Sequence, residues 1–122
     1  MSAAWVWIGA GVLGAIGSTG RFLLDGFVSR RTAGGFPWGT MAVNVMGAFA
    51  IGLVVGTGLV GDERFLVAGG LIGSFTTFST WMFETQRLAE DGEERMALLN
   101  LVLSVALGIG AVALGWWIGS RL

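Results

Sequence analysis

The sequence predicts an all-α membrane protein with four transmembrane helices. Of its 122 residues, 54% are hydrophobic and 12% are charged, and the mean hydropathy is +0.77, whereas roughly 25% of the residues of a soluble domain are charged. The charged residues leave four uncharged runs, 1–20, 32–61, 65–83 and 96–120. Each run is near or above the ~20 residues that cross a bilayer as a helix. The runs are continuously apolar, whereas the strands of a membrane barrel alternate.

The first helix is expected at about 4–27. This segment is not a signal peptide, because it has no basic residues at its start and is longer than a signal peptide. The second is expected at about 37–60, because Pro37 suits the first turn of a helix. A short charged link at 61–64 precedes the third helix, at about 65–87. The polar loop 89–95 then leads to the fourth, at about 96–119. All four belong to one transmembrane domain, 1–122.

The distribution of arginine gives only a weak preference for orientation. Four spans place two arginines on the side of the termini and four on the other side, which favours the second side as cytoplasmic. A bias this small allows insertion in both orientations. Many transporters use inverted repeats, which 122 residues cannot hold twice, and an antiparallel homodimer would supply the same symmetry.

The third span contains an unusual polar and aromatic stretch, GGLIGSFTTFSTWMFE at 69–84. Its glycines and hydroxyl residues are weak helix formers, so we expect a break near 73–77. Irregular backbone at membrane depth is tolerated only where it is buried in protein or lines water. The first half-helix would then offer its carbonyl end to a cation, and the second its amide end to an anion. The alternative is that each Ser and Thr bonds back to its own helix.

Two rings of this stretch, Phe78 and Trp81, lie three residues apart and therefore on one helical face. Phe75 would be in line with them if the helix were continuous. Aromatic rings are electropositive at their edges, so rings turned edge-on can solvate an anion. Ordinary core packing would account for the same spacing.

Three further polar residues lie within spans. Asn44 stands alone in the second helix and must face protein or water, either as a link between helices or along an ion path. Asn100 and Ser104 are four apart on the fourth helix, and either extend a polar track or each make one structural hydrogen bond.

Charged groups near span ends have similar alternatives. The Arg21 side chain has three alternatives: it extends to the membrane–water interface, it pairs with Asp25 one turn later, or it supplies positive potential at the entrance of an ion path. Glu84 follows the uncharged run directly, so we expect a solvated interfacial carboxylate rather than a buried proton carrier.

Composition excludes several chemistries. The chain has no Cys, His or Lys, which removes thiolate chemistry, imidazole relays and the lysine of a phosphate-binding loop. The net charge is −1, so nucleic acid is not an expected partner. The 22 glycines predict close helix packing within or between subunits, and the spaced sets are Gly52 and Gly56, Gly69 and Gly73, Gly115 and Gly119, and the run Gly11, Gly14, Gly17 and Gly20.

Three stretches together resemble the Fluc (CrcB) fluoride channel family: GSTGRF at 17–22, FPWGTMAVNVMGAF at 36–49 and GGLIGSFTTFST at 69–80. The resemblance extends over essentially the whole chain. It implies a passive fluoride-selective channel that exports F⁻ across the inner (cytoplasmic) membrane. It also implies an antiparallel, dual-topology homodimer with two pores.

The resemblance assigns roles to individual positions. Backbone carbonyls of Gly73 and Thr76 would hold a structural Na⁺ at the dimer centre. Pore or fluoride-binding roles fall on Arg21, Asn44, Phe78, Ser79, Thr80, Trp81, Glu84 and Ser104. The chain departs from the family at Trp81, where Phe is usual. Indole keeps an electropositive edge and adds an N–H donor, but it is bulkier.

Two rival functions remain at this stage. A proton-coupled exporter of the small multidrug type needs a carboxylate deep in a span, and the first helix has none before Asp25. A structural membrane subunit would merely pack against partners, and would pass no ion.

Overall fold

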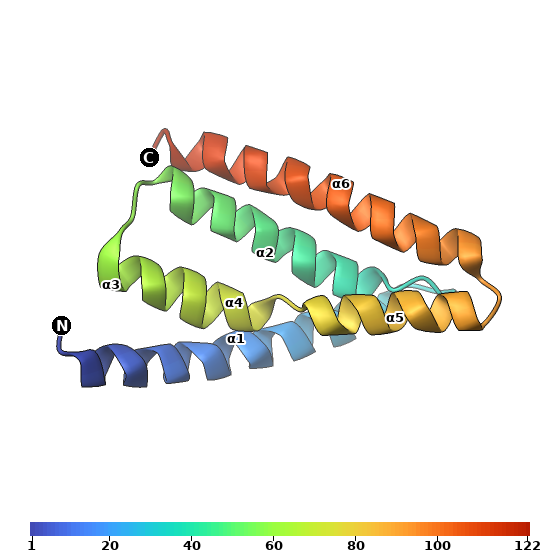
Figure 1. Ribbon diagram of the computed structural model, residues 1–122, viewed down its shortest axis with the longest axis horizontal. Helices are drawn as coiled ribbons and strands as arrows, with labels where there is room; N and C mark the ends of the chain where they lie inside the picture. The colour runs from blue at the N-terminus through green and yellow to red at the C-terminus, as the bar shows by residue number, and fades with distance from the viewer.

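The computed structural model describes residues 1–122 as an antiparallel bundle of four helical segments (Figure 1). The elements are α1 (Ala3–Arg31), α2 (Trp38–Gly56), α3 (Gly61–Arg64), the π-helix η1 (Phe65–Ile72), α4 (Gly73–Phe75), α5 (Phe78–Glu90) and α6 (Glu94–Gly119). Four segments are long and apolar enough to cross a membrane: Ala3–Arg31, Trp38–Gly56, Gly61–Glu90 and Glu94–Gly119. The chain is therefore a multi-pass membrane protein. Both termini and α3 lie at one end of the bundle (Figure 1).

Helix α1 has 29 residues, about 44 Å at 1.5 Å per residue. It continues past the expected end near residue 27 because arginine is a good helix former, and its length exceeds the ~30 Å of hydrocarbon that a span has to cross. The Arg31 guanidinium lies 3.6 Å from the centre of the Phe27 ring. The helix ends where Thr32 becomes extended, and Gly34 then adopts a φ of 90°.

Glycines bring α2 and α6 into backbone contact. A Cβ on Gly52 would overlap the Val112 carbonyl of α6, and a Cβ on Gly115 would overlap the Phe49 carbonyl of α2. Gly56 and Gly119 meet the opposite backbone in the same way. These two spaced pairs therefore act within the subunit.

A second close contact joins α1 to η1. A Cβ on Gly17 would overlap the Leu71 carbonyl, and one on Gly70 would lie 3.3 Å from the Cα of Ala10. Gly11 of the same glycine run faces open space, and the pair Gly69 and Gly73 meets only atoms of its own helix. The spaced pair Gly69 and Gly73 therefore makes no such interhelical contact, whereas Gly70 does.

The third span is irregular over much of its length. Residues Phe65–Ile72 form a π-helix, and the Gly73 N–H donates to the Ala68 carbonyl five residues back. A wide turn of this kind is uncommon and is frequent at functional sites. It leads into one α-turn, α4, and then into the break.

Candidate functional site

The third span is interrupted between α4 and α5, at Thr76 and Thr77. Both residues are extended, with φ/ψ of −82°/158° and −146°/118°. The Thr76 N–H still donates to the Ile72 carbonyl at 3.0 Å, whereas the Thr77 N–H leaves the helix. The break expected from the sequence is present, and it is visible as a thin connection between α4 and α5 (Figure 1).

Asn44 of α2 clamps the break. Its Oδ1 accepts from the Thr77 N–H at 2.8 Å, and its Nδ2 donates to the Thr77 carbonyl at 2.8 Å. One side chain therefore satisfies both backbone groups of an extended residue that is only 7% exposed, as a neighbouring strand would. A Cβ on Gly47 would overlap the Thr76 methyl, so Gly47 allows α2 to approach this closely.

The two sides of the break present opposite dipole ends. On the α4 side, the Gly73 carbonyl loses its helical donor because the Thr77 N–H donates to Asn44, and the Thr76 carbonyl accepts no backbone hydrogen bond. On the α5 side, Phe78 and Ser79 begin the helix, and the first N–H groups of a helix have no acceptor within it. The first arrangement favours a cation and the second an anion.

Thr77 caps α5, a role that the sequence analysis missed. The Thr80 N–H donates to Thr77 Oγ1 at 3.2 Å, and Thr77 Oγ1 donates to Thr80 Oγ1 at 3.1 Å. This is the usual function of a threonine just before a helix. The sequence TFST at 77–80 contains this N-cap signal, a threonine directly before the first residues of the helix. Back-bonding, the alternative reading of the hydroxyls, holds for Thr76, which donates to the Ile72 carbonyl at 3.2 Å.

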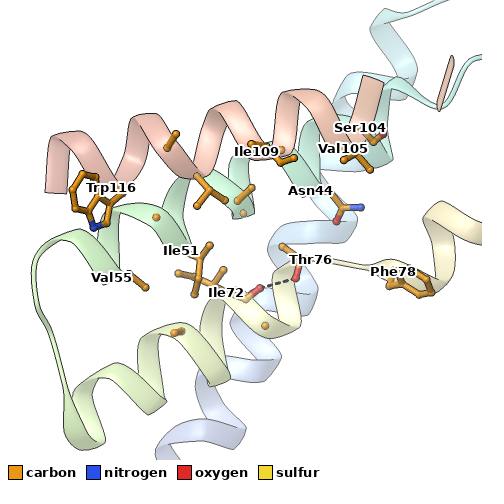
Figure 2. Close-up of a pocket in the computed structure, with 18 of the residues that line it drawn as sticks. Asn44, Ile51, Val55, Ile72, Thr76, Phe78, Ser104, Val105, Ile109 and Trp116 are labelled. Atoms are coloured by element: carbon orange, nitrogen blue, oxygen red, sulfur yellow. Dashed lines mark hydrogen bonds between the residues drawn. The ribbon is translucent and has the colours of Figure 1, made fainter. Parts of the chain in front are cut away.

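A groove of about 1100 Å³ runs between α2, the first half of the third span and α6 (Figure 2). It brings together several residues that the sequence analysis selected, namely Asn44, Gly73, Thr76, Phe78, Trp81 and Ser104. Asn44, Thr76 and Ser104 lie at the end nearer to the break, and Val55 and Trp116 lie toward the other end (Figure 2). Most of the remaining lining is aliphatic.

A smaller cavity of about 180 Å³ lies on another side of Thr77. Its lining residues come from α1, α2 and the start of α5: Ser18, Arg21, Phe22, Asp25, Thr40, Val43, Thr77 and Thr80. Thr80 therefore faces this cavity and does not line the groove. Ser79 lines neither, but its hydroxyl lies 3.5 Å from that of Thr77.

Arg21 makes no ion pair with Asp25. The one ion pair of the chain joins the terminal amine to Asp62, at 3.7 Å, and Asp25 instead accepts a hydrogen bond from Ser29 at 3.1 Å. Arg21 and Asp25 both line the small cavity without contacting each other, so the cavity is lined by one positive and one negative group.

The solvated interfacial carboxylate expected at Glu84 is only partly exposed. It is half-buried, and its Oε1 accepts a hydrogen bond from the Thr40 hydroxyl. Thr40 is buried on α2, one turn before Asn44, so both residues face α5. The spacing of Thr40 and Asn44 could have identified Thr40 as a site residue.

The aromatic pair is arranged edge to face. The ring centres of Phe78 and Trp81 are 5.8 Å apart with an interplanar angle of 79°. The Trp81 Nε1–H donates to the Asn100 carbonyl at 3.3 Å. Phe75 is separated from these rings by the break and lies against Gly20 of α1.

Comparison with known proteins identifies the family. The model of the CrcB-like protein family, Camphor Resistance (CrcB), matches residues 8–116. The chain belongs to the CrcB family. Its relatives include the fluoride-specific ion channel FluC 2 of Mycobacterium bovis, 50% identical over 93% of this chain and 90% of the relative.

Other members of the family are similar over comparable lengths. The fluoride-specific ion channel FluC of Geobacter sulfurreducens is 47% identical over 88% of each chain. The fluoride-specific ion channel FluC 1 of Symbiobacterium thermophilum is 42% identical over 90% of this chain and 97% of the relative. The match therefore includes α2, the break and the part of α6 that carries Ser104.

Proposed function

We propose that this protein is a passive fluoride-selective channel that exports F⁻ across the cytoplasmic membrane. Its CrcB relatives carry the name of fluoride-specific ion channels. The observation that carries the proposal is the break clamped by Asn44, which exposes helix-end dipoles at membrane depth beside a hydroxyl and aromatic lining.

Fluoride is small and strongly hydrated, so a pore has to replace its water with many weak donors. Phe78 and Trp81 supply ring edges, and hydroxyls come from Ser79, Thr80 and Ser104. None of these groups carries a full charge, which lets an ion leave as readily as it enters. Arg21 at the small cavity would attract the anion at an entrance, and Glu84 with Thr40 would belong to a polar track.

The active unit is an antiparallel homodimer with two pores. Phe78 is 70% exposed in the single subunit, although it lies inside a span and beside the groove. A second copy in the opposite orientation would cover this surface and complete each pore with residues from both subunits. It would also supply the symmetry of an inverted repeat.

A structural Na⁺ fits the carbonyl side of the break. Carbonyls at the C-terminal end of a half-helix and in unwound backbone are the usual ligands for Na⁺ in broken membrane helices. Gly73 and Thr76 carry such carbonyls: the helical donor for Gly73, the Thr77 N–H, bonds to Asn44 instead, and the Thr76 carbonyl accepts no backbone hydrogen bond. Two subunits would contribute two carbonyls each to one ion between them.

Transport requires no energy source in the protein. A negative-inside potential favours outward movement of an anion by ~2.3 kcal/mol per 100 mV. The absence of a carboxylate in the groove also separates this proposal from a proton-coupled exporter of cations.

The test is ion efflux from liposomes that contain the purified protein, measured with fluoride and chloride electrodes against protein-free liposomes. We expect rapid F⁻ loss with little Cl⁻ loss. Equal fluxes of the two ions would contradict a selective channel. Flux of an organic cation driven by a pH gradient would support the exporter, and no flux of any ion would support a structural subunit.

Dual topology can be tested because the chain contains no Cys. A single cysteine introduced as S2C lies in the exposed N-terminal segment. An impermeant maleimide should label about half of the molecules from each side of the membrane. Labelling from one side alone would show a single insertion orientation.

A further inference from the structure

The indole N–H of Trp81 is already occupied within the subunit. It donates to the Asn100 backbone carbonyl at 3.3 Å, while the Trp81 ring meets Phe78 edge to face. Trp81 therefore offers a ring to the groove, and its N–H donor is directed into α6.

Asn100 connects α5 to α6 at two levels. Its side chain is 1% exposed, and its Nδ2 donates to Thr85 Oγ1 at 2.8 Å. The Thr85 hydroxyl in turn donates to the Trp81 carbonyl at 2.8 Å. Asn100 Oδ1 lies 3.5 Å from the Ser104 hydroxyl.

This geometry couples the side chain of Asn100 to the orientation of Trp81. Thr85 lies one turn after Trp81 on α5, so a bond from Asn100 to Thr85 fixes how α5 sits on α6. That position keeps the Asn100 carbonyl within reach of the indole. With the N–H held, Trp81 cannot turn its donor into the groove, where an additional strong donor would retain an anion and slow its exit.

We infer that Asn100 is a positioning residue that locks the Trp81 indole and so sets the rate and halide selectivity of conduction. The inference rests on the proposed channel function. It assigns to Trp81 the role of an aromatic edge rather than of an N–H ligand, and it places Thr85 in the same unit.

The lock can be measured without transport, by hydrogen exchange of the indole N–H groups in NMR spectra of ¹⁵N-labelled protein in micelles. The chain has six Trp, and W81F identifies the Trp81 signal by its loss. We expect the Trp81 N–H to exchange more slowly than that of Trp117, which is 51% exposed. Exchange of Trp81 should accelerate about fivefold or more in N100L and T85V, the change expected for loss of one hydrogen bond.

Two variants serve as controls for this measurement. T85S keeps the hydroxyl and should retain slow exchange. T19V removes a hydroxyl that bonds only to its own helix, at Ala15, and should leave Trp81 unchanged. If the Trp81 N–H of the wild type exchanges as fast as that of Trp117, the lock does not exist and the inference fails, whether or not the protein conducts fluoride.

A double-mutant cycle tests the link to conduction. We expect N100L to lower fluoride efflux from liposomes about fivefold and to reduce the fluoride-to-chloride ratio. In the W81F background the same substitution should have little further effect, because the group on which it acts is gone. Equal effects of N100L in the wild-type and W81F backgrounds would show that Asn100 affects conduction through another residue, such as Ser104. This result would overturn the inference.

T85V provides the same cycle if N100L does not fold, since Val matches Thr in shape and leaves Asn100 in place. Absence of fluoride flux in the wild type would instead count against the proposed function, and the exchange measurement would still decide whether the lock exists.

Discussion

Replacing Asn44 with Leu is expected to release the break in the third span. The side chain makes two hydrogen bonds of 2.8 Å, one to the N–H and one to the carbonyl of Thr77. Leu has the same branched skeleton of four heavy atoms, is somewhat larger and has no polar atom, so both bonds disappear while the shape of the side chain is largely kept.

The magnitude follows from those two bonds and from the surroundings of Thr77. Each bond contributes about 0.5–1.5 kcal/mol net in proteins, and about 0.6 kcal/mol on average in membrane proteins. When only one partner is removed, each buried backbone group left without a partner costs ~1–3 kcal/mol instead of this net value. Thr77 lines a cavity of about 180 Å³, where water could take over part of the lost bonding, so the lower end of that range applies.

The sum is about 2–3 kcal/mol, which corresponds to about a 30- to 150-fold decrease in the ratio of protein with an ordered break to protein with a disordered break. Fluoride efflux from liposomes should fall by up to this factor, because the ordered form is the one that conducts. The midpoint of thermal unfolding in detergent should also decrease. The matched control is Met46→Leu, because Met46 is 53% exposed on the same helix and should behave as the wild type.

Asn44→Asp separates the two bonds. A carboxylate still accepts from the Thr77 N–H but cannot donate to the Thr77 carbonyl, and it adds negative charge beside the path of an anion. Its fluoride efflux should fall at least as far as that of Asn44→Leu. Efflux within twofold of the wild type for Asn44→Leu, together with an unchanged unfolding midpoint, would refute the assignment of Asn44 as the clamp.

Three further outcomes test other parts of the structure. Phe78→Ile should reduce fluoride efflux strongly without lowering subunit stability, because Phe78 is 70% exposed in the subunit; a loss of folded protein in proportion to the loss of flux would contradict this. Gly115→Ala should destabilise the protein by about 1–3 kcal/mol, since the added Cβ would overlap the backbone of α2, whereas Gly110→Ala meets nothing within 4 Å and should be neutral in the same thermal unfolding assay. Replacing Na⁺ with N-methyl-D-glucamine should weaken the dimer in size-exclusion chromatography, and an elution profile independent of the cation would argue against the carbonyl site at Gly73 and Thr76.

Much of the architecture depends only on the order of charged and apolar residues. Four uncharged runs require four helices, because a helix is the structure that satisfies every backbone group of a continuous apolar segment in lipid. The glycines and hydroxyl residues in 69–80 indicate an interruption of the third helix, because they are weak helix formers. The spacing of Gly52 with Gly56, and of Gly115 with Gly119, indicates close helix contacts.

The partners of the polar groups could not be read from the sequence, because they come from helices far apart in the chain. The sequence allowed Asn44 to be a link between helices or a pore residue, and the fold shows which atoms it binds at the break. The fold likewise directs the Glu84 carboxylate to Thr40, and it places Arg21 and Asp25 at the same cavity without an ion pair between them.

Helical periodicity alone would place Phe75, Phe78 and Trp81 on one face. The break removes Phe75 from that face and turns the Trp81 N–H toward Asn100. The sequence by itself determined that this span is interrupted and apolar enough to lie in a membrane. Only the tertiary structure decided which side chains replace the lost helical bonds, because a hydrogen bond depends on distance and direction between segments that sequence spacing does not specify.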